Sequence, residues 1–191
     1  MVQVPTKPLT LEEFLALPET KPASEFIDGN ILQKPMPQGE HSTLQGDLTS
    51  AINAALKPPK IGRAYPELRC TFGGRSIVPD VAVFRWERIP RQPDGRVENV
   101  FMLPPDWTIE ILSPGQSQSR VIRNILHCLS HGAEMGWLLD PEEGCIFVYG
   151  ANQSVQLSVQ LFDEPDSVLP VPAFAEAVRL TVGEIFGWLQ A

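Results

Sequence analysis

Two short apolar segments, residues 80–84 and 108–112, place the strongest constraint on how this chain can fold. Both are β-branched and nearly continuous in apolar character, which is typical of strands covered on both faces of a sheet. Such a sheet needs helices to cover it. Residues 40–57, where Leu or Ile recurs every fourth position, and residues 117–131, which end at Gly132, have the required amphipathic pattern. The sequence therefore predicts an α/β fold.

Shorter signals predict the elements around this core. Residues 10–13 have the capping-box spacing of a helix start, Asp28-Gly29 marks a tight turn between two strands, and residues 141–144 separate two more strands. The other predicted elements are strands at 65–72 and around Val155, Leu157, Val159 and Leu161, a long irregular and loosely held segment at 85–107, and a closing helix at 181–190.

The length of 191 residues and the hydrophobic content of 43% suit one hydrophobic core. We therefore expect a single domain over residues 1–191. Within it we expect an N-terminal helix and hairpin (9–35), a central core (40–150), and a C-terminal strand and helix (151–191).

The net charge of −8 argues against a nucleic-acid-binding surface that is basic throughout, but the charge is unevenly distributed. Between Arg63 and Arg96, seven arginines are set against four acids, which gives this segment a local charge of +3. The segregation is compatible with a basic strip beside an acidic cleft, where Arg88, Arg91 and Arg96 would contact phosphates. A solvated loop would have the same pattern.

The apolar runs are far shorter than the roughly 20 residues that span a bilayer, so no membrane segment is predicted. The N-terminus also lacks the charged-then-apolar pattern that directs secretion, and we expect a cytoplasmic protein. Cys70, Cys128 and Cys145 are an odd number without a CxxC pair, which favours buried thiols over disulfides or a zinc site.

Two acids are placed where acids are costly. Asp80 follows Pro79 at the start of one apolar strand, and Glu110 lies in the middle of the other. A buried carboxylate costs several kcal/mol unless a cation or hydrogen-bond donors compensate it. Magnesium is a natural partner because it takes one or two protein carboxylates together with waters and phosphate oxygens. The alternatives are that Asp80 only opens a strand and that Glu110 faces water or pairs with an arginine.

The order of several short motifs resembles the Uma-two family of restriction-endonuclease-like proteins, within the PD-(D/E)XK superfamily. The resemblance extends from about Glu25 to Tyr149. The motifs are Glu25 ahead of Asp28-Gly29, His41, Glu67, Pro79-Asp80, Glu110-Ile111-Leu112-Ser113-Pro114 and Gly136-Trp137-Leu138-Leu139-Asp140-Pro141.

This resemblance implies a restriction-endonuclease-like mixed β-sheet flanked by α-helices. It also implies that Asp80 and Glu110 hold magnesium or manganese, with Glu25 as a further acid at the site. The implied activity is that of a magnesium-dependent endodeoxyribonuclease that hydrolyses DNA phosphodiester bonds. Separately, we count a homodimer among the expected assemblies. The alternative is a catalytically inactive module of the same fold that binds nucleic acid or a protein.

The lysine that this superfamily carries two residues after the second acid is missing, because Leu112 is there. Family resemblance points to Asn124 as a second place for that lysine, and it too is occupied by another residue. Arg120, Asn124, His127 and His131 have the spacing of one polar helix face, so Arg120 is the predicted substitute cation. Any activity should then be weak, because arginine is a poor proton shuttle.

Two other residues have open roles. His41, near the start of a predicted helix, would either touch a phosphate or cap the helix. Glu67 is either a fourth acid of the site or, as we prefer, an ion-pair partner of Arg63 or Arg69.

Overall fold

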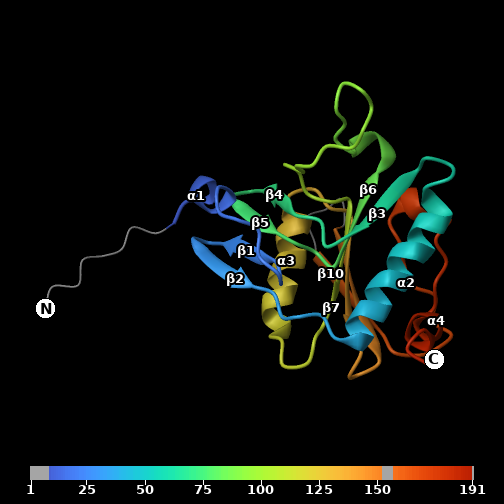
Figure 1. Cartoon of the computed structure of the whole chain (residues 1–191). Coiled ribbons are helices and arrows are strands. Elements are labelled where there is room, and N and C mark those ends of the chain that lie inside the picture. The colour runs from blue at the N-terminus through green and yellow to red at the C-terminus, as the bar shows by residue number, and fades with distance from the viewer. Residues whose placement is uncertain (1–8, 152–156, 191) are drawn as a thin grey trace, which may run out of the picture.

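The computed structural model describes residues 9–151 and 157–190. Its centre is a six-stranded sheet in the order β10-β9-β8-β7-β6-β3 (Figure 1). Neighbouring strands are antiparallel except for β7 and β8, which are parallel. The strands are β3 Gly62–Pro66, β6 Val81–Arg85, β7 Trp107–Ile111, β8 Met135–Asp140, β9 Cys145–Ala151 and β10 Leu157–Phe162.

Two long helices, α2 (Gly39–Leu56) and α3 (Gln118–Ser130), cover opposite faces of this sheet (Figure 1). Successive side chains of a strand point to opposite faces, so Val81 and Val83 pack on the α2 side while Ala82 and Phe84 pack on the α3 side. Both helices were predicted from their periodicity. The predicted mixed sheet flanked by helices is confirmed.

A second sheet, in the order β2-β1-β5-β4, lies beside α3 (Figure 1). Its strands are β1 Ser24–Ile27, β2 Asn30–Gln33, β4 Cys70–Phe72 and β5 Arg75–Ile77. The predicted hairpin is the pair β1 and β2. Its turn needs two residues in the left-handed region, and Asp28 (φ 50°) and Gly29 (φ 81°) adopt it.

The predicted strand at 65–72 is wrong, because the chain leaves β3 at Pro66 and begins β4 only at Cys70. Glu67 has a positive φ of 47° between the two strands, which breaks the extended backbone there. β5 was not predicted. It is three residues long and includes the polar Ser76, so no alternation marks it.

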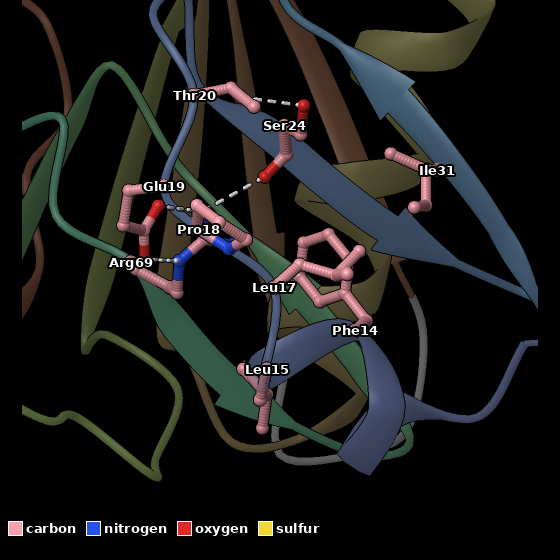
Figure 2. A pocket seen from close by; sticks show the side chains of 9 residues that line it. All are labelled: Phe14, Leu15, Leu17, Pro18, Glu19, Thr20, Ser24, Ile31 and Arg69. Carbon is pink, nitrogen blue, oxygen red and sulfur yellow. Dashed lines mark hydrogen bonds and ion pairs between the residues drawn. The ribbon is translucent and has the colours of Figure 1, made fainter.

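A short helix, α1 (Leu11–Leu15), fixes the hairpin from outside. Its predicted capping box is present, since the side chains of Thr10 and Glu13 each accept from the other residue's backbone N–H. Phe14 stacks on Phe26 of β1 with ring centroids 5.5 Å apart. Arg69 then joins the following segment to β1 by bonding the Glu19 carboxylate and the Ser24 carbonyl (Figure 2).

The segment 85–107 is mostly irregular, as predicted, apart from the 3₁₀ helix η1 (Trp86–Arg88). It is not loosely held, however. The Arg88 guanidinium donates to the buried Asp106 carboxylate and to the Pro104 carbonyl, and Phe101 is buried in the core. These contacts tie the segment to the start of β7.

The C-terminal part closes the α2 side of the core through a short 3₁₀ helix η2 (Ala173–Ala175) and α4 (Val182–Gly187), which is shorter than the predicted helix. β10 matches the predicted strand, although Val155 lies outside the described residues.

Cys70, Cys128 and Cys145 are buried and free. Among the described helices, none combines the length and apolar character that crossing a membrane requires.

Candidate active site

Asp80 and Glu110 lie side by side because of the register between β6 and β7. Val81 is paired with Ile109 in this antiparallel ladder, and continuing the register by one residue sets Asp80 opposite Glu110. Both carboxylates point to the α3 side of the sheet and are 2–3% exposed. Asp80 Oδ2 accepts a hydrogen bond of 2.8 Å from the Ile111 amide, which fixes its orientation.

Lys34, at the end of β2, is the cation beside these acids. Its ammonium donates to Asp80 Oδ1 over 2.6 Å and to the Val78 carbonyl over 2.7 Å, and it is 3.8 Å from Glu110 Oε2. Lys34 was not predicted as a site residue. The expected lysine positions were close to Glu110 in the chain, whereas the hairpin brings in a lysine from 46 residues before Asp80.

Glu25 and Asn124 complete the cluster. Glu25, on β1, is 5% exposed and accepts from the Val78 amide over 2.8 Å. The Asn124 amide on α3 donates to both of its carboxylate oxygens, at 3.2 and 3.3 Å. The small sheet and α3 thus bring a third acid close to Lys34.

The electrostatics of the site are those of three buried acids with one ammonium. Burial raises the pKa of the Glu110 carboxyl well above its ordinary range, and Lys34 opposes that shift while Asp80 and Glu25 add to it. Burial alone would lower the pKa of Lys34, but the charges of Asp80, Glu110 and Glu25 outweigh burial and raise it. Lys34 therefore stays protonated at neutral pH.

His41, on the first turn of α2, is also part of the cluster. Its Nε2 is 3.3 Å from Asp80 Oδ1, and the residue is 5% exposed. Burial lowers the pKa of the His41 imidazole, and Asp80 works against that shift. His41 does not cap α2, because the N-cap residue is Gln38 and no side chain caps the helix there.

The donor set is suited to a hard divalent cation. Glu110 Oε1 is buried and has no hydrogen-bond partner among the described residues, so a carboxylate oxygen is available next to Asp80. In the described part of the chain, no three His, Cys, Asp or Glu side chains form a ready metal cage. An ion here would be coordinated by Asp80, Glu110 and ligands from outside the protein. Magnesium usually binds in this way.

Arg120, the predicted substitute cation, is exposed and makes no hydrogen bond or ion pair with the acids. The prediction that Asn124 and His127 lie on an exposed polar face with it is wrong. Both are buried, at 5% and 8% exposure, because the small sheet covers this side of α3. His127 stacks on Phe72 of β4 with ring centroids 4.7 Å apart.

The structure does not bring Arg88, Arg91 or Arg96 to the acids. Arg88 bonds Asp106, which precedes β7 and is about 13 Å along the strand from Glu110. Arg96 pairs with Asp94, and Arg91 stacks over Trp86.

The preferred role of Glu67 as an ion-pair partner of Arg63 or Arg69 is corrected as well. Arg69 bonds Glu19, Ser24 and Ser76, and Arg63 lies over the Tyr65 ring. Glu67 is exposed, and its charge acts on His41.

Two of the cavities in the described part of the chain differ in size and in their relation to these residues. One, of about 410 Å³, is lined by Gln38, Gly39, Glu40, His41, Leu112, Pro114 and Pro141, so it adjoins the acids through His41 and Leu112. The other lies between α1 and the hairpin (Figure 2) and is about 70 Å³, too small for the ligands that occupy typical sites of about 300–1,000 Å³.

Comparison with known proteins places these features in a family. The family model of Uma2, described as "Putative restriction endonuclease", matches residues 11–183. A crystal structure described as a "putative nuclease belonging to DUF820" from Anabaena variabilis ATCC 29413 is 56% identical, with a TM-score of 0.91. The alignment covers 95% of this chain and 99% of that one. No curated protein matches the chain.

Proposed function

Since this chain belongs to the Uma2 family of restriction-endonuclease-like proteins, we propose that it is an endonuclease that hydrolyses DNA phosphodiester bonds with the help of magnesium or manganese. The observation that carries the proposal is the Lys34 ammonium between Asp80 and Glu110. The superfamily pattern expects a lysine beside two acids, and here Lys34 of the N-terminal hairpin lies there.

Asp80 and Glu110 would hold the cation, since Glu110 has an unpaired buried oxygen and Asp80 lies across from it. A bound divalent cation supplies Lewis acidity toward the phosphate and a more acidic bound water. The protein's own part is to neutralise charge and to fix geometry.

Lys34 would stabilise the negative charge that develops on the phosphate during hydrolysis. It is held by Asp80 and the Val78 carbonyl, so it would need no reorganisation at the moment of reaction. Because its neighbours raise its pKa, it would act as a hydrogen-bond donor and not as a general base. Glu25, held by the Val78 amide and Asn124, would keep the ammonium in place.

The test is cleavage of plasmid and single-stranded DNA with magnesium or manganese, for wild type, Asp80→Ala and Glu110→Ala. We expect cleavage by wild type alone. Manganese should also raise the melting temperature of wild type but not that of Glu110→Ala, because it binds the folded site.

A different outcome would favour the catalytically inactive binding module. If wild type shifts DNA in a gel but leaves it intact with every metal, and manganese changes neither melting temperature, the hydrolytic proposal is wrong.

A further inference from the structure

The N-terminus of α2 is uncapped where it opens onto the cavity beside the acids. The first bond within the helix runs from the Ser42 amide to the Gln38 carbonyl over 2.9 Å. The amides of Gly39, Glu40 and His41 come before it, so the helix itself gives them no acceptor. No side chain caps this end, and among the described residues no carbonyl elsewhere accepts from the three amides.

The second observation is the unsatisfied His41 ring in the wall of that cavity. His41 is 5% exposed, and neither of its ring nitrogens has a hydrogen-bond partner in the described part of the chain. Nε2 faces Asp80 Oδ1 at 3.3 Å without hydrogen-bond geometry, and Nδ1 has no neighbour of that kind. A buried imidazole N–H without a hydrogen-bond acceptor is costly, so a ligand oxygen that reaches this N–H would satisfy it.

The cavity has the size and position of a subsite of the candidate active site. Its volume of about 410 Å³ lies within the range of ligand sites, and Leu112 in its wall is two residues after Glu110. Along the same segment, the Oγ of Ser113 is buried and also has no hydrogen-bond partner within residues 9–151 and 157–190.

The donors define the class of ligand. Free amides and the positive end of an 18-residue helix favour an anion with several acceptor oxygens. The Glu40 carboxylate on the same wall opposes an anion, so the amides and His41 must outweigh it. A phosphate within a nucleic-acid strand that also reaches Asp80 has an advantage over a free anion. The strand then makes contacts both at the N-terminus of α2 and at the acids.

We propose that the uncapped N-terminus of α2, together with His41, binds one backbone phosphate of the nucleic acid. This phosphate is next to the phosphodiester bond that lies at Asp80 and Glu110 for hydrolysis. The inference rests on the proposed function and assigns it a substrate subsite. The helix backbone, and not the arginine-rich segment, then holds the strand at the acids.

Gly39 allows a test that removes a single donor. Proline is well tolerated at the first position of a helix, and Gln38 before it is already extended, at φ −104° and ψ 176°. A Cβ added at Gly39 meets no heavy atom within 4 Å. Gly39→Pro therefore deletes one N–H, and Gly39→Ala is the matched variant that keeps it.

The measurement is the fluorescence anisotropy of a labelled DNA duplex with the full chain in EDTA, with inorganic phosphate as competitor. Gly39→Pro should bind DNA at least about tenfold more weakly than Gly39→Ala, since a hydrogen bond to a charged group is lost. Phosphate should displace DNA from Gly39→Ala at lower concentration than from Gly39→Pro. His41→Phe, which removes both ring nitrogens, should weaken binding as well, and thermal melting confirms that each variant is folded.

Equal affinities of folded Gly39→Pro and Gly39→Ala would overturn the subsite while leaving the proposed function intact, because plasmid cleavage tests that function separately. If wild type neither cleaves nor binds DNA, the proposed function fails and the subsite fails with it.

Discussion

At the scale of single residues, Lys34 and Asn124 occupy two places from which a cation can reach the acids. Lys34 contacts Asp80 directly, and Asn124 contacts Glu25 at 3.2 Å from the other side. The family resemblance points to a lysine at the second place. This chain has the lysine at the first, which explains why both acids can be buried without Arg120.

Moving the lysine from position 34 to position 124 tests whether the two places are equivalent. Lys34→Met should lower kcat for DNA cleavage by at least about 100-fold, because a preorganised charge at the phosphate is lost. Adding Asn124→Lys to Lys34→Met should recover part of that loss, since the new ammonium enters the same acidic cluster.

Lys34→Met combined with Asn124→Met is the matched control and should stay inactive. If Lys34→Met alone cleaves as fast as wild type, Lys34 has no part in the reaction.

His127 gives a prediction about pH and stability. Burial lowers the pKa of His127, although its contact with the Phe72 carbonyl opposes the shift. Below the ordinary histidine pKa of about 6.5, the His127 imidazole is protonated in the unfolded chain but stays neutral in the folded protein. The contribution of neutral His127 to the free energy of unfolding is therefore fully present above that pH. It is lost as the pH falls toward and through the lowered pKa.

His127→Gln should remove this part of the acid sensitivity. In urea unfolding across this window, wild type should lose up to about 1.4 kcal/mol per pH unit more than the variant. Parallel pH profiles of the two proteins would contradict the assignment.

At the scale of elements, the charge of the arginine-rich segment is compensated mostly by acids from other parts of the chain. Arg69, Arg75, Arg88 and Arg96 pair with Glu19, Asp28, Asp106 and Asp94. Most of these acids lie outside the segment in the chain. A local charge counted along the sequence could not reveal these ion pairs. Because of them, the charge of the suggested basic strip is largely neutralised on folding.

Arg88→Ala should therefore act on stability more than on DNA binding. It leaves the buried Asp106 carboxylate with fewer donors, and because Arg88 is partly exposed we expect a loss of about 1–2 kcal/mol in unfolding free energy. Asp106→Asn in the Arg88→Ala background should reduce the loss. A slope of log affinity against log salt that falls by about one, with unchanged stability, would instead make Arg88 a phosphate contact.

For the whole molecule, the elements with clear periodicity were predictable and the packing between them was not. The leucine stripe of α2 and the Asp28-Gly29 turn are local signals, and the structure confirms both. The burial of Asn124 depends on the small sheet, half of which comes from three-residue strands with no alternation. Asp80 and Glu110 could be proposed from their apolar surroundings, whereas Lys34 is set beside them only by the tertiary fold.

The way this cluster is assembled has a consequence for protein synthesis. Lys34 meets Asp80 across 46 residues, and Glu25 meets Asn124 across 99. Contacts between such distant parts of a chain form slowly and late. The hairpin leaves the ribosome before α3, which Glu25 contacts, has been made, so a nascent chain does not yet have the assembled cluster on which the proposed function rests. The cluster is complete only after α3 has been made and has docked.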